Sequence, residues 1–245
     1  MRRLRGPLVV VVILLLWEAI CQLGFVPRVV LPPPSAIVGA AIDSWSDYWQ
    51  GMQVTVGEIA IATLIAWLGG IVLGCLLGAG PVLGAAFGPV LAALFAVPLI
   101  TWYPLFMTWF GLGSASKIAY GAVSGILPVA IGTLNGVRGV DRTRLLFGRA
   151  AGCTRLQLTT RIVLPSALPS IIASLRIGSA LTVIGVIVAE MLASLDGIGF
   201  LISYNRTMFN TGHVYLGIIL ALLCAVAANR LLSLIEHRFD RWRDA

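Results

Sequence analysis

The charged residues of this 245-residue chain gather in a few short segments, and long apolar stretches separate them. Only 11% of the residues are charged, while 59% are hydrophobic. A soluble domain carries about 25% charged residues to solvate its surface. Most of the surface of this chain must therefore face lipid, and the sequence predicts an all-α integral membrane protein.

Six stretches are long enough to cross a bilayer as helices, which takes about 20 mostly apolar residues. They are residues 8–25, 56–79, 84–104, 117–136, 170–193 and 214–236. Pro81 separates the second span from the third, which predicts a hairpin, and Pro98 and Pro128 fall inside spans. The first stretch follows a basic N-terminus, as in a secretory signal, but no cleavage site follows it, so we expect a retained helix. Residues 1–245 then form one transmembrane domain.

The arginines predict how the chain is oriented. Thirteen of them lie on one side of the six-span arrangement, against Arg28, Lys117 and Arg206 on the other, with Arg176 inside the fifth span. Because basic residues mark cytoplasmic loops, both termini and residues 137–169 are expected in the cytoplasm. The net charge of +7 does not indicate nucleic-acid binding, since the arginines lie between apolar segments rather than along one polar face.

The first external segment predicts an interfacial helix. Residues 31–35 contain three prolines and cannot be helical, whereas Ser35 can cap the helix that follows. Apolar and aromatic residues then recur at helical spacing from Ile37 to Trp49. Such a helix either anchors the chain at the membrane surface or contacts a partner outside.

Glycines at every fourth position indicate close helix contacts. They are Gly70, Gly74 and Gly78, then Gly84 and Gly88, then Gly121 and Gly125. Small residues at this spacing let helix backbones approach each other within a membrane. The pattern does not distinguish packing inside one bundle from packing between two copies of the chain.

The segment between the fourth and fifth spans is long and basic, yet its sequence predicts order. Asp141 can cap a helix that runs to about Ala151, and Gly152 then breaks it. Thr154 and Gln157 form the signature of a capping box for a second helix, which we expect to stop before Pro165. Two short helices joined at a glycine would make a rigid element suited to docking a soluble partner.

This segment resembles part of a known motif. Gly152, followed after nine residues by Ile162-x-Leu164-Pro165, is similar to the second half of the EAA motif, which marks the permeases of binding-protein-dependent ABC importers. Four further pieces resemble the nitrate, sulfonate and taurine branch of that family, so that the resemblance covers nearly the whole chain. They are LPPP from Leu31, VPLITWYPLFMTWFG over 97–111, GVRGVD over 136–141, and Glu190-Met191 with Gly197-Ile198-Gly199.

The chain departs from the motif at two places. Leu146, Phe147 and Gly148 stand where the motif has its acidic residue and two alanines. Glu58 stands where this branch often carries a basic residue.

The resemblance implies the architecture of a type I ABC importer permease, with a coupling helix seated in a groove of a separate ATP-binding cassette ATPase subunit. That subunit would bind ATP and Mg. It also implies an external solute-binding protein, a second permease copy in a homodimer, and a bacterial plasma (inner) membrane. The substrate would be a small solute such as a sulfonate, nitrate, taurine or a vitamin precursor. The implied coupling residues are Arg149, Ala150, Ala151, Gly152, Cys153, Thr154, Arg155, Leu156, Ile162, Leu164 and Pro165.

The chain itself is not expected to be an enzyme. It has no GxxxxGK[ST] loop, because its only lysine, Lys117, lies in GLGSASKI. Only His213 and His237 are available for a metal site or a nucleophile triad, so we predict no catalytic residue, no metal and no bound cofactor. A stand-alone secondary transporter or channel would also explain the spans, but not the structured basic loop.

Four residues are candidates for the translocation path: Trp102, Tyr103, Glu190 and Met191. A carboxylate is expensive in lipid, so Glu190 either lines the path or makes a structural bond to a neighbouring helix or backbone amide. The two aromatic residues, with Trp109, either line the path or belong to the aromatic belt at the membrane surface.

Overall fold

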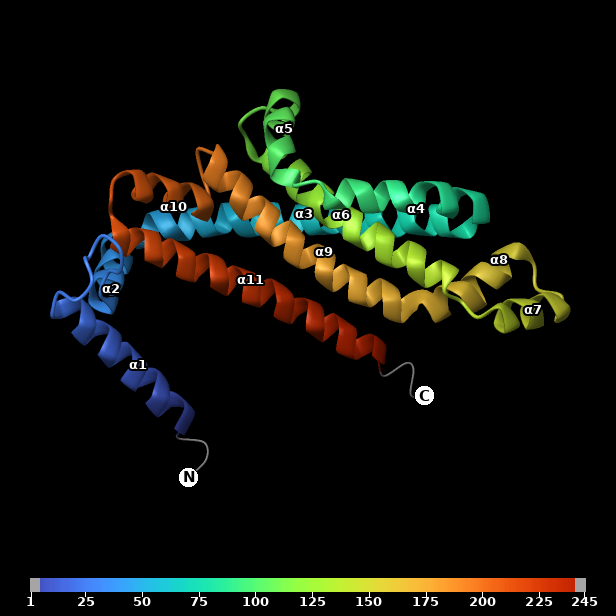
Figure 1. Ribbon diagram of the computed structural model, residues 1–245, viewed down its shortest axis with the longest axis horizontal. Helices are drawn as coiled ribbons and strands as arrows, with labels where there is room; N and C mark the ends of the chain where they lie inside the picture. The colour runs from blue at the N-terminus through green and yellow to red at the C-terminus, as the bar shows by residue number, and fades with distance from the viewer. Residues whose placement is uncertain (1–4, 241–245) are drawn as a thin grey trace. The chain divides into compact units, whose positions relative to one another are not determined.

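The computed structural model describes residues 5–240, and all regular secondary structure in this range is helical, with no β-strand (Figure 1). The arginines expected at the two ends of the chain, Arg2, Arg3, Arg241 and Arg243, lie outside the described residues. The elements in order are α1 (Arg5–Gln22), α2 (Pro34–Asp43), α3 (Trp45–Ala79), α4 (Pro81–Ala96), the 3₁₀ turn η2 (Leu99–Trp102), α5 (Tyr103–Phe110), α6 (Ser114–Arg138), α7 (Arg142–Ala150), α8 (Arg155–Leu158), the π-helical turn η3 (Thr159–Val163), α9 (Leu164–Leu192), α10 (Ile198–Thr207) and α11 (Thr211–Asp240).

Among the described residues, four helical stretches are long and apolar enough to cross a membrane. They are α3, α6, the continuous stretch Arg155–Leu192 and α11. α4 and the segment after it form a fifth span if the two are counted as one bent span. The apolar part of α1, Val9–Gln22, is shorter than the other candidate spans. The all-helical membrane architecture is therefore confirmed, and the count of six spans stays a prediction that depends on α1.

The predicted third span, residues 84–104, is wrong as a straight helix. α4 ends at Ala96, and the chain bends by 86° before it continues through η2 and α5. Pro98 causes the break, because a proline pushes the residue before it out of the helical region. Val97 accordingly has φ −74° and ψ 133°. Pro128, in contrast, lies inside α6 as predicted.

The predicted interfacial helix over residues 37–49 is also wrong as one piece. α2 ends at Asp43, Ser44 leaves the helical region with φ −127°, and α3 begins at Trp45. Tyr48, placed on the amphipathic stripe by its spacing, is buried and donates a hydrogen bond to the carbonyl of His213 at 2.7 Å. Tyr48 therefore packs inside the protein and does not face the membrane surface.

The chain divides into two compact units, Met1–Val56 with Glu190–Cys224 (unit 1) and Gly57–Ala189 with Ala225–Ala245 (unit 2). Unit 1 has a core of buried side chains from α2, α3, α10 and α11: Ile37, Ala40, Tyr48, Ile198, Ile202, Leu216, Leu220 and Cys224.

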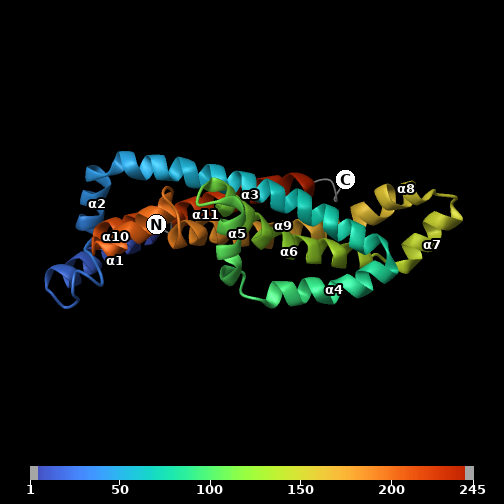
Figure 2. The same ribbon diagram turned by 90° about the horizontal axis from the view of Figure 1, so that it is seen from above.

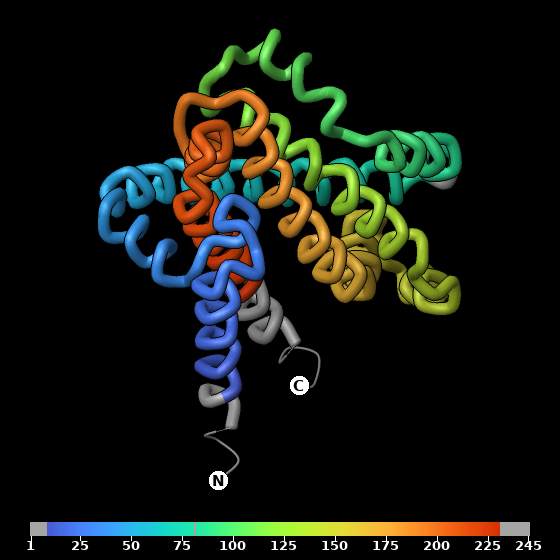
Figure 3. The backbone as a smooth tube through the Cα atoms, turned by 60° about the vertical axis from the view of Figure 1, so that its left-hand side comes forward, coloured from blue at the N-terminus to red at the C-terminus, as the bar shows by residue number. Residues whose placement is uncertain are grey.

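Unit 2 contains three closely packed helical segments, residues 57–79 of α3, α6 and α9, which we call the three-helix core. α6 and α9 run side by side in Figure 2, and the loop that joins them lies at one end of both in Figure 3. A Cβ added at Gly74 would lie 2.6 Å from the carbonyl oxygen of Ala130, and one at Gly78 would lie 2.8 Å from Cβ of Val137. A Cβ added at Gly125 would lie 2.7 Å from Cβ of Ala66. The glycine repeats therefore serve packing within the chain.

Candidate functional site

The loop between α6 and α9 begins with a capped helix. The carboxylate of Asp141 accepts a hydrogen bond from the N–H of Thr143 at 2.8 Å and so caps α7. That hydrogen bond holds the pKa of Asp141 below its usual value. The predicted start of the first loop helix is confirmed.

The end of α7 turns at Gly152, which has φ +76°. The N–H of Gly152 donates to the carbonyl of Arg149 at 3.0 Å, and that of Cys153 donates to the carbonyl of Gly148 at 3.1 Å. These are the two hydrogen bonds of a Schellman motif, which needs a residue in the left-handed region. The backbone conformation therefore favours glycine here, although a Cβ would find open space.

The second loop helix starts as predicted but does not stop before Pro165. Thr154 and Gln157 form a complete capping box, with hydrogen bonds of 2.9 and 3.3 Å. α8 then continues through η3 directly into α9, with Pro165 inside the continuous stretch. The wider π-helical turn just before Pro165 accommodates the missing proline N–H, so no break is needed.

Gly148 lets α7 pack against the second half of the loop. A Cβ at this position would lie 2.8 Å from Cδ1 of Leu158 and would overlap the Ile162 side chain. Gly148 is buried, although its neighbours are exposed. Glycine rather than alanine therefore stands at position 148 because a methyl group would not fit against Leu158 and Ile162.

The most exposed large apolar side chains of the loop are Leu146, Phe147 and Leu156, which are 55%, 75% and 73% exposed. Five arginines of the same segment are exposed as well. They are Arg142, Arg144, Arg149, Arg155 and Arg161. Arg144 is held in place by a hydrogen bond of 3.2 Å to Ser166 Oγ. The loop, residues 141–165, is thus held by local hydrogen bonds and has an apolar and basic surface, and we call it the docking loop after the role proposed for it below.

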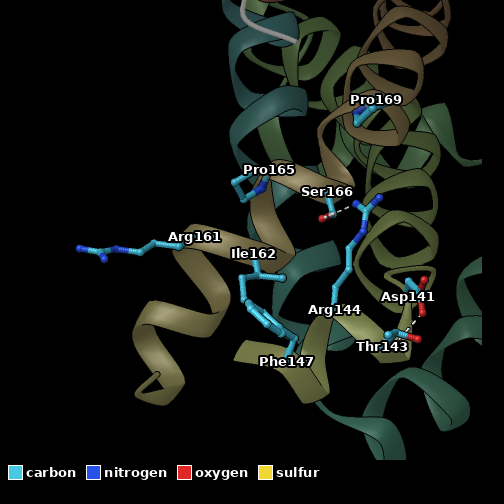
Figure 4. A pocket seen from close by; sticks show the side chains of 9 residues that line it. All are labelled: Asp141, Thr143, Arg144, Phe147, Arg161, Ile162, Pro165, Ser166 and Pro169. Atoms are coloured by element: carbon cyan, nitrogen blue, oxygen red, sulfur yellow. Dashed lines mark hydrogen bonds between the residues drawn. The ribbon is translucent and has the colours of Figure 1, made fainter. Parts of the chain in front are cut away.

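Two pockets flank the docking loop. The first, of about 820 Å³, lies between α7 and the start of α9, where Arg144 reaches toward Ser166 and Arg161 points away (Figure 4). The second, of about 750 Å³, is bounded by the ends of α3 and α6 and by the turn at Gly152.

The structure brings most of the predicted coupling residues together around these pockets. Ile162 and Pro165 line the first pocket. The second is lined by Arg149, Cys153, Arg155 and Leu164, among others. Ala150, Ala151 and Thr154 are exposed at the turn.

Sequence reasoning missed Leu146 and Phe147 as surface residues of the site. In the sequence, these two residues were identified only as departures from the motif. The available signal was two large apolar residues side by side within a basic segment outside the predicted spans, which is unusual for solvent-facing positions.

The four predicted path residues do not form one cluster within a single unit. Trp102 and Tyr103 belong to unit 2, where buried Tyr103 packs its ring against that of Tyr120 at 5.3 Å. Glu190 and Met191 belong to unit 1, and Met191 packs against the core of that unit.

Glu190 is 1% exposed and holds α10 in place. Its carboxylate accepts hydrogen bonds from Thr55 Oγ1 at 2.7 Å and from the N–H of Gly199, in the first turn of α10, at 2.8 Å. Thr55 Oγ1 in turn accepts from the N–H of Ile198 at 2.9 Å. A Cβ on Gly197, which has φ +99°, would overlap the carboxylate. Of the two readings, this geometry favours the structural bond.

A second buried carboxylate forms an ion pair. Glu58 Oε1 lies 2.7 Å from Nζ of Lys117, and both side chains are buried, with 3% and 0% exposed. Glu58 joins α3 to α6 in unit 2. Glu58, which departs from the family pattern, thus has Lys117 as its partner, and the sequence did not indicate this pair.

The described residues hold no group of three or more His, Cys, Asp or Glu that could bind a metal.

Comparisons with known proteins fit this arrangement. A riboflavin transport system permease protein, RibX of Chloroflexus aurantiacus, is 31% identical over 96% of this chain and 89% of its own length. A taurine transport system permease protein, TauC of Escherichia coli, is 29% identical over 94% and 86%. A nitrate import permease protein, NrtB of Leptolyngbya laminosa, is 28% identical over 78% and 68%.

The fold has solved counterparts. Two inward-facing structures of the MetNI methionine ABC transporter match 79% of this chain and 98% of theirs, with a TM-score of 0.61 and 17% and 20% identity. Residues 70–241 match the family described as the binding-protein-dependent transport system inner membrane component. The chain belongs to that family, as the motif around Gly152 indicated.

Proposed function

We propose that the chain forms the path by which a small solute is imported, and that its docking loop binds a separate ATP-binding cassette ATPase subunit. The observation that carries this proposal is the exposure of Leu146, Phe147 and Leu156 on a loop that is fixed at both ends. The caps at Asp141 and Thr154 and the turn at Gly152 fix the loop locally. An element of this kind can transmit movement between two subunits.

The energetics favour a protein partner for this surface. Fully burying a Leu or Phe side chain contributes about 1.5–3 kcal/mol. Leu146 and Phe147 gain only part of that stabilisation within their own unit, because 55% and 75% of their surfaces remain exposed. The neighbouring arginines would form the charged rim of the contact, where exposed ion pairs add about 0–1 kcal/mol each.

The remaining parts of the assembly are proposed from membership of the family. An external solute-binding protein would deliver the solute, and ATP and Mg would bind the ATPase subunit. The arginine distribution supports a cytoplasmic docking loop and cytoplasmic termini. The solute classes are those named for the relatives, including taurine, nitrate and riboflavin.

We also propose a homodimer. The glycine repeats do not supply its interface, because Gly70, Gly74 and Gly78 each face α6 of the same chain. The exposed face of α9 remains available for that contact.

The test is binding of the cognate ATPase subunit to purified protein in detergent. The double variant Leu146→Ser/Phe147→Ser should lose at least about tenfold in affinity, since two apolar contacts are removed. Phe209→Ser is the matched control, because Phe209 is 74% exposed and belongs to unit 1. Equal binding by the double variant and the wild type would refute docking through this surface.

A further inference from the structure

α3 and α6 pack in one register along the three-helix core. Their contacts repeat every four residues, and each α3 residue meets the α6 residue that lies 59 positions later in the chain. The pairs are Glu58 with Lys117, Ala62 with Gly121, Ala66 with Gly125, Gly70 with Val129, Gly74 with Thr133 and Gly78 with Val137. In every pair after the first, a Cβ added to the glycine would come within 3.4 Å of the partner's Cβ. We call this row of pairs the α3–α6 seam.

The small residues of the seam do not by themselves fix its register. If α6 moved along α3 by four residues, which is about 6 Å, every new pair would again contain a glycine or an alanine. Gly74, for example, would then face Val129 or Val137, depending on the direction. Small residues at every fourth position therefore allow close packing in more than one register.

The ion pair is the contact that distinguishes these registers. Glu58 Oε1 lies 2.7 Å from Lys117 Nζ, and the two side chains are 3% and 0% exposed. A slip by one turn would put Gly121 opposite Glu58, or Ala62 opposite Lys117, and would move the two buried charges apart. Separating buried opposite charges is strongly destabilising, so the pair favours the observed register.

Two neutral hydrogen bonds restrain the same helices, but they do so through α9. Trp67 Nε1 on α3 donates to Ser179 Oγ at 2.8 Å, and Ser170 Oγ donates to the carbonyl of Gly132 on α6 at 2.9 Å. A hydrogen bond between neutral groups is weaker than one between charged groups. Among these three polar contacts, the ion pair joins α3 directly to α6.

We propose that Glu58 and Lys117 are positioning residues, which hold α6 in register with α3 and thereby set the place of the docking loop. α6 ends at Arg138, and the cap of the docking loop follows at Asp141. A slip of α6 by one turn would therefore move the start of the loop by about 6 Å. The last pair of the seam also lines the second pocket beside the docking loop. The consequence for ATPase binding rests on the proposed function, whereas the register itself does not.

Pulsed electron paramagnetic resonance measures the register without the ATPase subunit. Nitroxide labels are attached at Leu64→Cys on α3 and Asn135→Cys on α6, both at exposed positions, after the four native cysteines are replaced by serine or alanine. Leu64 lies level with Val123, twelve residues before Asn135, so the labels are offset by about 18 Å along the helix axes. A slip by one turn would change the distance between the labels by about 4–6 Å.

The deciding variant is Glu58→Leu/Lys117→Met, which replaces both charges with apolar side chains and should still fold. We expect it to show a shifted or second label distance and at least about fivefold weaker binding of the ATPase subunit. Glu58→Asp, which keeps the charge, should retain the single distance and the affinity of the wild type. Trp67→Phe is the matched control, because it removes only the neutral bond to Ser179, and it should also keep the single distance.

A single wild-type distance in the apolar double variant would overturn the proposal, and so would failure of that variant to fold, because the pair would then serve stability rather than register. A second distance in Trp67→Phe would assign the register to α9 and would overturn it as well. If the wild-type protein does not bind the ATPase subunit, the proposed function fails, while the label distances still decide the role of the ion pair.

Discussion

Two glycines of unit 2 show how the three-helix core differs from the docking loop. Gly74 in the core has a regular helical backbone, but any side chain there would collide with Ala130 and Thr133 of α6. Gly152 in the loop is surrounded by open space, but its φ of +76° excludes most side chains. The core depends on close approach of helices, whereas the loop depends on one backbone conformation. The first region should therefore control stability, and the second should control partner binding.

The largest expected effect is on the core. Gly74→Ala should lower the free energy of unfolding by about 2–3 kcal/mol, because the added methyl group overpacks the α3–α6 contact. Gly88→Ala is the matched control, since its Cβ would meet Leu134 at an ordinary 3.6 Å and alanine favours a helix. Thermal unfolding in detergent measures both. Equal stability of the two variants would remove the distinction between core and loop.

Glu190→Gln extends the comparison to unit 1. The amide offers one acceptor where the carboxylate accepts from Thr55 and Gly199 with both oxygens. Losing one of these buried hydrogen bonds should cost about 1–3 kcal/mol of stability. We expect a lower yield of folded protein with unchanged transport per molecule. Slower transport at unchanged yield would instead place Glu190 in the translocation path.

Gly152→Val should separate folding from docking. Valine in the left-handed region costs about 1–2 kcal/mol, which would distort the turn between α7 and α8 rather than the spans. Insertion and thermal stability of the bundle should stay near wild type, while ATPase binding or its coupling to transport is lost. Gly152→Asn should be milder, because asparagine tolerates this region. If the valine variant binds its ATPase and transports normally, the turn is not part of the docking element.

The smallest effect is expected for a rim charge. Arg149→Ala should weaken ATPase binding by about 0–1 kcal/mol, because Arg149 is exposed. The loss should shrink further at high salt, where such charges are screened. A loss as large as that of Leu146→Ser/Phe147→Ser would show that charge rather than apolar contact dominates the surface.

The sequence predicted the features that depend on local chemistry. The caps at Asp141 and Thr154 and the turn at Gly152 follow from short-range hydrogen bonds, which a pattern of three or four residues specifies. The bend at Pro98 and the passage of the helix through Pro165 were predicted wrongly, because the same residue type breaks one helix and is absorbed by a π-helical turn in the other. The Glu58–Lys117 pair was not predicted either, since 59 positions separate the two residues along the chain.

The most direct test of the central proposal is proximity of the docking loop to the ATPase subunit. Phe147→Cys and Phe209→Cys replace two side chains of nearly equal exposure, 75% and 74%, and each can carry a short thiol-linked photocrosslinker in a background without native cysteines. We predict that illumination of the reconstituted complex yields a crosslink to the ATPase subunit from Phe147→Cys and none from Phe209→Cys. A crosslink from both positions in equal yield, or from Phe209→Cys alone, would contradict the assignment of residues 141–165 as the docking element.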